Sequence, residues 1–134
     1  MNNKERTLAR ENIVKILYQK DINQNDITTI ISTFVEKRKF DNTYFSDVLK
    51  LLDIKMNEID NFIQKNANVT EFEASVIDRS ILRLSVCEFL FRKDVPKKVI
   101  IDESIKIAKK FSSEQSFKFI NKILDQLLKS NHEN

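Results

Sequence analysis

The chain has 134 residues, of which 41% are hydrophobic and 32% charged, and its formal net charge is +3. This balance is typical of one globular domain with a buried core and excludes a disordered chain. Glycine is absent and proline occurs once, at Pro96, so the sequence has no Gly-rich phosphate loop and few residues suited to tight β-turns. Nucleotide-driven catalysis is therefore excluded, and an all-α fold is expected.

Apolar residues at helical spacing predict four helices in the first half of the chain. The first runs from about Lys4 to Lys20, and the second follows an N-cap at Asn25 or Asp26 and is closed by Lys37, Arg38 and Lys39. A weak break near Asp53 separates the third helix from the fourth, and residues 66–69 form a loop. The predicted inner stripes of the first two helices are Ala9, Ile13, Ile16 and Leu17, and then Ile27, Ile30, Ile31, Phe34 and Val35.

Three further helices are predicted in the second half. Thr70 and Glu73 fit a capping box that starts a helix ending near Arg92. Apolar residues surround this helix on almost all sides, which is typical of a central helix. Pro96 precedes a helix from about Val99 to Phe111, residues 112–115 form a turn, and a last helix ends near Lys129.

The residues that most often carry catalysis or bind metals are scarce. The single histidine, His132, lies in the polar tail 130–134, so no nucleophile in the folded part has an imidazole base. Cys87 stands in an apolar run and is interpreted as a small core residue, and the acidic residues are dispersed along helix surfaces. We therefore expect no enzymatic activity, no metal and no cofactor. The lone cysteine and the lack of a membrane-spanning run favour a cytoplasmic protein without a membrane partner.

Three sequence runs of the second half occur in a distinctive order. They are Val76–Arg83 followed by Glu88; Asp94-Val95-Pro96 followed by Val99 and Ile101-Asp102-Glu103; and Ala108-Lys109-Lys110-Phe111 followed by Lys118-Phe119-Ile120-Asn121. The first helix adds Ala9-Arg10-Glu11 and Leu17-Tyr18-Gln19. Together these runs resemble the NusB family of transcription antitermination factors. The resemblance covers nearly the whole chain, although residues 22–70 are less diagnostic.

The resemblance implies a single domain, 1–134, of six to seven helices in two small bundles, at about 1–65 and about 70–130. It also implies recognition of the boxA element in ribosomal RNA leader transcripts, together with NusE, a protein of the small ribosomal subunit. Such a complex suppresses termination and involves RNA polymerase and other antitermination components indirectly. The implied mechanism is recognition without catalysis.

The resemblance and the helical wheel together indicate nine candidate RNA-binding residues. The cations of the first helix suit phosphate contacts, and Tyr18 shares a polar helix face with Lys4, Glu11 and Lys15, where its ring can stack on a base. A solvated helix face explains the same cations, and periodicity alone favours the core for Phe119. The candidates are Lys4, Arg6, Arg10, Tyr18, Asp78, Arg79, Gln115, Lys118 and Phe119.

Two features depart from the family pattern. The family opens with a dense arginine cluster, whereas this chain has Lys4, Arg6 and Arg10, and its glycine positions hold Ser112 and Lys122. Arg83 is expected to be structural, with Glu88 or an acid of the following helix as its partner. The weaker basic cluster leaves open a second function, that of an RNA-independent helical adaptor or homodimer. A third is a stand-alone relative of the N-terminal module of ribosomal RNA cytosine methyltransferases, although the length leaves no room for a methyltransferase domain.

Overall fold

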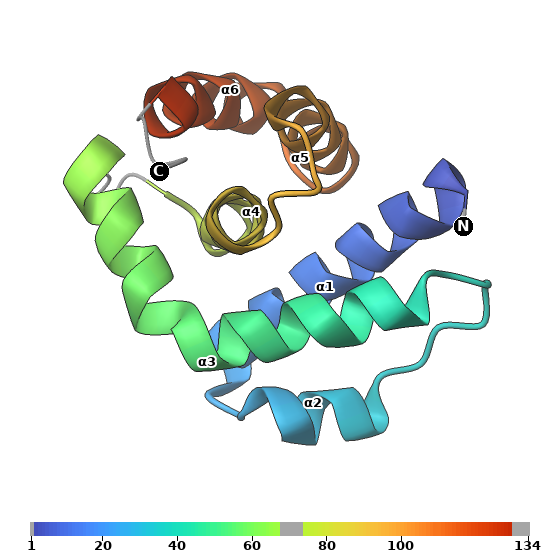
Figure 1. Ribbon diagram of the computed structural model, residues 1–134. Helices are drawn as coiled ribbons and strands as arrows, with labels where there is room; N and C mark the ends of the chain where they lie inside the picture. Colours follow the sequence, from blue (N-terminus) through green and yellow to red (C-terminus); the bar gives the residue numbers. More distant parts are fainter. Residues whose placement is uncertain (1, 68–73, 130–134) are drawn as a thin grey trace.

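The computed structural model describes residues 2–67 and 74–129. These residues form six α-helices and no strands, which confirms the predicted all-α class (Figure 1). Thr70, Glu73 and His132 lie outside the described residues. The helices are α1 (Asn3–Asn23), α2 (Ile27–Thr33), α3 (Asn42–Ala67), α4 (Val76–Phe91), α5 (Lys97–Phe111) and α6 (Glu114–Lys129).

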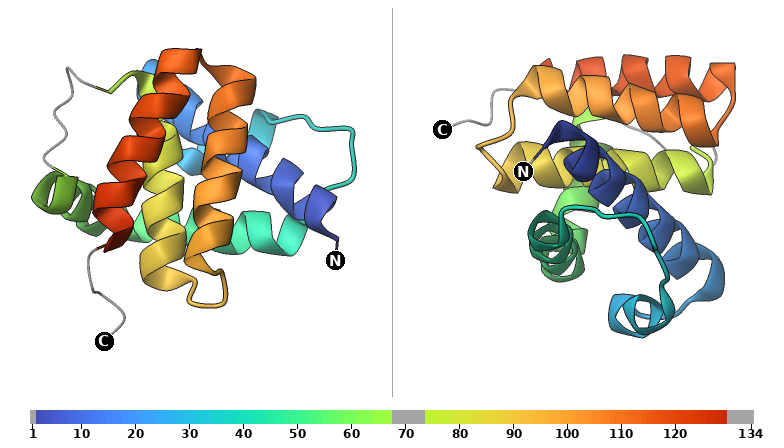
Figure 2. Two further views of the ribbon diagram at one scale, coloured as in Figure 1. Left: turned by 90° about the horizontal axis from the view of Figure 1, so that it is seen from above. Right: turned by 90° about the vertical axis from the view of Figure 1, so that its right-hand side faces the viewer.

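Helix α4 occupies the centre of the molecule. Figure 1 shows α5 and α6 above it, and α2 and the first half of α3 below it, whereas the second half of α3 rises beside it toward α6. The left view of Figure 2 shows α4, α5 and α6 side by side, with α1 crossing them. One hydrophobic cluster connects the two groups of helices, because fully buried Ile13 of α1, Ile81 of α4 and Leu124 of α6 belong to it. Cys87 is part of this core, as expected, and burial raises the pKa of its thiol to about 12. The assignment of 1–134 to a single domain stays a prediction.

Local capping explains where several helices begin. The Asn2 side chain accepts a hydrogen bond of 2.7 Å from the Glu5 amide, and Asp26 accepts one of the same length from Thr29. Asp26 is thus the N-cap of α2, one of the two predicted candidates. Ser75 caps α4 by accepting from the Asp78 amide, so the central helix begins at Val76 and not at the predicted position near residue 70.

The predicted break near Asp53 is wrong, because one continuous helix, α3, spans both predicted helices and extends through the predicted loop residues 66 and 67. The sequence 42–67 contains neither proline nor glycine, so no residue interrupts its backbone hydrogen bonds. Leu52 and Ile59 are fully buried on either side of the expected break, and Figure 1 shows that α3 bends rather than ends.

The second helix is shorter than its apolar pattern predicts. Helix α2 ends at Thr33, and Phe34 has extended backbone angles and packs its ring 6.1 Å from the ring of Phe45. Ile31 is 39% exposed and Val35 is 77% exposed, so the predicted inner stripe is wrong at both positions. At Phe34, packing of the ring against Phe45 outweighs helical periodicity. The basic run 37–39 therefore lies in the segment between α2 and α3 and does not close a helix.

Candidate nucleic-acid interface

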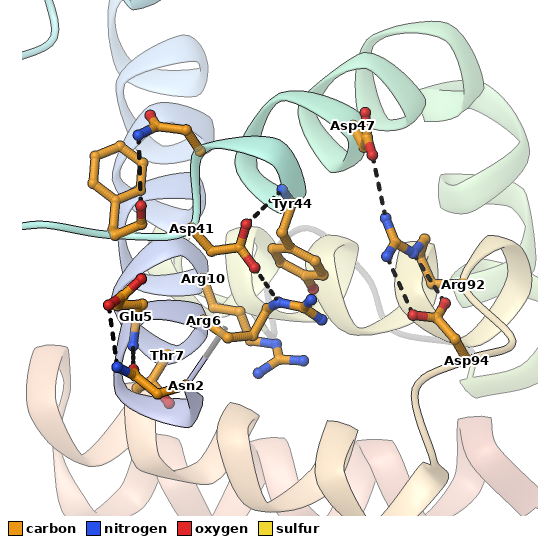
Figure 3. A network of polar contacts seen from close by, with 12 residues as sticks. Asn2, Glu5, Arg6, Thr7, Arg10, Asp41, Tyr44, Asp47, Arg92 and Asp94 are labelled. Atoms are coloured by element: carbon orange, nitrogen blue, oxygen red, sulfur yellow. Dashed lines mark hydrogen bonds and ion pairs between the residues drawn. The ribbon is translucent and has the colours of Figure 1, made fainter.

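The first turns of α1 carry two of the predicted cations on accessible positions. Lys4 is exposed, whereas Arg6 keeps about a quarter of its side chain exposed and forms a 2.8 Å ion pair with Asp41. The Arg6 guanidinium also lies over the ring of Tyr44, 4.1 Å from its centroid (Figure 3). The ion pair and the ring contact thus fix the orientation of the Arg6 side chain, whereas Lys4 is exposed.

Arg10 does not belong to the accessible surface, although the sequence pattern places it among the phosphate contacts. It is 3% exposed and bonds to Glu88 and Glu103, each at 3.0 Å. Burial by itself lowers the pKa of Arg10, but the adjacent carboxylates outweigh burial and raise it above its ordinary value. The charge of Arg10 is therefore matched inside the protein, and the prediction that it contacts phosphate is corrected to a role in helix packing.

Tyr44 links this buried ion pair to the surface. Its hydroxyl donates a hydrogen bond to Glu88, and burial, followed by the charge of Glu88, raises the pKa of that hydroxyl. Its ring lies within 5.2 Å of the guanidinium of Arg92, which pairs with Asp94 at 3.1 Å. Figure 3 shows how α1, α3 and the end of α4 converge on this ring. The network fixes the start of α1 against the two other helices.

Tyr18 lies on the outer face of α1, as the helical wheel predicts. It is 41% exposed, in contrast to Ile16 and Leu17 beside it, which are buried. Lys15, one turn earlier, places its ammonium 5.7 Å from the ring centroid of Phe111 at the end of α5. This contact brings the middle of α1 next to the turn between α5 and α6.

The start of α4 meets the start of α6 through Asp78. This carboxylate is 4% exposed, accepts a 3.4 Å hydrogen bond from Ser116, and leaves its second oxygen without a partner among the described residues. Burial raises the pKa of Asp78, against the hydrogen bonding of Ser75 and Ser116. Asp78 is thus largely enclosed, and it contacts the first turn of α6 through Ser116.

The two arginines of α4 both point to the end of α1. Arg79, about a quarter exposed, pairs with Asp21 at 3.6 Å and donates to the Ala74 carbonyl. Arg83 is structural, as predicted, but its partners are Asp21 and Asp60, at 3.0 and 2.9 Å, and not Glu88. The prediction of the partner is wrong because Glu88 turns to the opposite part of α1, where it neutralises Arg10.

The first turns of α6 contain the remaining candidates. Gln115 and Lys118 are exposed, and Lys118 forms only a loose surface pair of 3.4 Å with Glu114. Phe119 is partly buried and packs against the core, so its ring serves packing on at least one side. Lys4, Tyr18, Gln115 and Lys118 are thus the exposed candidates. Arg6, two residues after Lys4, lies on another side of α1, where it faces Asp41 and Tyr44.

Two further cations were not among the predicted site residues. Lys15 shares the outer face of α1 with Lys4 and Tyr18. The helical wheel therefore could have identified Lys15 as a candidate. Lys110, on α5, reaches α1 and pairs with Glu11 at 2.9 Å. The sequence gives no indication of that contact, because the two residues are 99 positions apart.

The fold defines the class of protein: an all-α helical domain, with exposed Lys4 and Tyr18 on the outer face of α1. In residues 2–67 and 74–129, no three His, Cys, Asp or Glu side chains are grouped to hold a metal ion. The same part of the chain contains no helix that is long and apolar enough to cross a membrane.

Comparison with known proteins identifies the family. Residues 7–129 match the model of the NusB family. The transcription antitermination protein NusB of Shewanella woodyi is 37% identical over 131 residues, which cover 96% of this chain and 98% of the relative. The chain therefore belongs to the NusB family, which confirms the resemblance seen in the sequence.

Solved structures agree with this assignment. The T. maritima NusB structure superposes with a TM-score of 0.81 at 31% identity and covers 96% of this chain and 92% of its own. A crystal structure of the antitermination factors NusB and NusE in complex with dsRNA has a TM-score of 0.83, with coverage of 96% and 98%. At 23% identity this second likeness shows a shared fold.

Proposed function

We propose that this chain is a transcription antitermination factor of the cytoplasm that binds boxA-type RNA in ribosomal RNA leader transcripts together with NusE. The observation that carries the proposal is the outer face of α1, which combines exposed Lys4 with a 41% exposed tyrosine, Tyr18. Family membership supports it, since the curated relatives are transcription antitermination proteins. The assembly would reach RNA polymerase through other antitermination components.

Each candidate residue has a distinct task. Lys4 and Arg6 attract phosphates without regard to base identity, because ammonium and guanidinium groups bind the negatively charged backbone. Tyr18 offers a ring on which an unpaired base stacks, and Gln115 supplies an amide that can bond to a base edge. Lys118 adds a further phosphate contact. Arg79 and Phe119, both partly buried, complete this corner, whereas Asp78 positions it.

NusE enters the proposal because the accessible charge is modest. With Arg10 neutralised inside the protein, α1 itself keeps few accessible cations for the RNA segment held near Tyr18. A fold relative is crystallised with NusE and dsRNA, which agrees with a joint RNA-binding surface. Positive coupling between NusE and RNA is therefore expected, on the usual scale of about 1 to 3 kcal/mol.

The decisive experiment titrates a boxA-type RNA oligonucleotide with this protein, with and without NusE, at two salt concentrations. We expect NusE to tighten RNA binding roughly 5- to 150-fold, and higher salt to weaken it. RNA affinity that stays undetectable with saturating NusE would instead support an RNA-independent adaptor or homodimer, which sedimentation of the free protein would then distinguish. Methyl transfer from S-adenosylmethionine by this chain would contradict the proposed non-catalytic role.

A further inference from the structure

A groove of about 760 Å³ lies between the first turns of α1, the segment 34–41 and the second half of α5. We call it the cationic groove, because five basic side chains line it and two acidic ones, Glu5 and Glu11, do so as well. The basic residues are Lys4, Arg38, Lys39, Lys106 and Lys110.

Two contacts hold the walls of the cationic groove in place. The amide of Asp41 donates a 3.1 Å hydrogen bond to the carbonyl of Glu5, and the Asp41 carboxylate pairs with Arg6, which together fix the end of segment 34–41 to α1. On the other side, Lys110 of α5 pairs with Glu11 of α1. The groove is therefore a built feature of the fold, formed by three elements that are distant in the sequence.

The charges of the groove are available to an anion. Lys4 and Lys39 are exposed and form no ion pair within the part of the chain that the structure describes, and they belong to opposite walls. Arg38, Lys106 and Lys110 pair with Glu36, Glu103 and Glu11, but these cations keep at least half of their side chains exposed. The three carboxylates are at most 10% exposed, so the pairs themselves stay in place, and the exposed part of each cation is what a phosphate can contact.

The lining of the groove favours a nucleic-acid backbone over a protein. Leu8 is the one large apolar side chain that lines it, and Leu8 is itself buried, whereas protein partners anchor through aromatic and aliphatic side chains in apolar pockets. The groove also begins at Lys4, on the same helix face as Lys15 and Tyr18. Lys4 and Tyr18 are 14 positions apart, which is about 21 Å of helix at 1.5 Å per residue. One extended RNA strand can therefore follow this face of α1 from the groove to Tyr18.

We infer that the cationic groove binds the phosphates of a single-stranded RNA segment that flanks the bases held near Tyr18, with Arg38 and Lys39 as its contacts on the outer wall. This inference rests on the proposed RNA-binding function and extends its footprint to segment 34–41. In this chain, Arg38 and Lys39 would supply backbone contacts that the sparse basic cluster of α1 does not.

The test uses the full chain, in complex with NusE, and two RNA lengths. The short RNA is the smallest boxA-type oligonucleotide whose affinity still depends on Tyr18, and the long RNA adds six uridines at one end or the other. The test variant is Arg38→Gln/Lys39→Gln. Its matched control is Lys50→Gln/Lys65→Gln, which removes two exposed charges of α3 that do not line the groove. Circular dichroism and thermal unfolding verify that both variants fold.

We expect one of the two extensions to tighten binding to the unmodified protein, and Arg38→Gln/Lys39→Gln to abolish that gain while short-RNA affinity changes less than twofold. The slope of log affinity against log salt for the long RNA should fall by up to about 1.4, since each single-strand phosphate contact contributes about 0.7. The control variant should keep both the gain and the slope.

Three results would overturn the inference without touching the proposed function. The first is normal short-RNA binding with no gain from either extension. The second is a gain that the test and control variants reduce equally. The third is loss of affinity of the test variant for an acidic peptide with long-RNA binding intact, which would assign the groove to a protein partner instead. By contrast, absence of any Tyr18-dependent RNA binding would refute the proposed function itself.

Discussion

Replacing Arg10 with alanine separates a structural role from an RNA-binding role. The substitution removes the positively charged partner of two carboxylates, and the two carboxylates differ in the hydrogen bonds that remain to them. Glu103 keeps hydrogen bonds from Thr7 and Lys106, at 2.6 and 2.9 Å, whereas Glu88 keeps only the hydroxyl of Tyr44 among its described side-chain partners. One buried carboxylate is thus left without a countercharge, which places the cost near the lower end of the 3 to 5 kcal/mol range for a broken buried pair, at about 3 kcal/mol.

The assay is urea unfolding at neutral pH, followed by circular dichroism, with thermal unfolding in parallel. Arg10→Ala should lower the melting temperature by on the order of 10 °C. Arg10→Lys should rescue only part of the loss, since a single ammonium cannot reproduce the forked contacts to Glu88 and Glu103. Lys4→Ala, an exposed substitution of the same helix, serves as the control and should change stability by under about 0.5 kcal/mol.

RNA binding provides the opposing readout. One outcome would refute the burial argument. In that outcome Arg10→Ala keeps the unfolding free energy of the unmodified protein but binds RNA more weakly, with a smaller slope of log affinity against log salt, which would show that Arg10 contacts phosphate. If stability falls and the folded fraction binds RNA with an unchanged slope, the ion pairs with Glu88 and Glu103 explain its role.

Three further predictions concern the remaining candidates. Lys4→Ala/Arg6→Ala should reduce the salt slope of RNA binding by up to about 1.4, and an unchanged slope would remove α1 from the phosphate path. Tyr18→Ala should weaken RNA binding by about 1 to 3 kcal/mol with stability nearly unchanged, whereas Tyr18→Phe should bind normally, and a marked loss of melting temperature in Tyr18→Ala would show packing instead. The raised pKa of Asp78 means that ionising it costs stability as the pH rises through that pKa. Asp78→Asn should therefore gain stability relative to the unmodified protein from acidic to neutral pH in urea unfolding, and a constant difference across that range would contradict the assignment.

The amino-acid sequence by itself determined the helical class and most of the helices. Helical periodicity and N-caps such as Asp26 act between residues three or four positions apart, so local pattern is sufficient to predict them. The exposed position of Tyr18 followed from the same periodicity. Family motifs, read directly from the sequence, supplied the expected RNA and NusE partners, which neither composition nor charge could indicate.

The tertiary structure decided which charges are available for binding. Arg6 and Arg10 are adjacent cations of one helix, yet Arg10 is neutralised by Glu88 and Glu103, which are 78 and 93 positions away. Segment 34–41, which the apolar pattern assigns in part to a helix, instead brings Lys39 next to the start of α1. In both cases the outcome depends on packing between distant elements, because burial and countercharge are set by neighbours in space and not by neighbours along the chain.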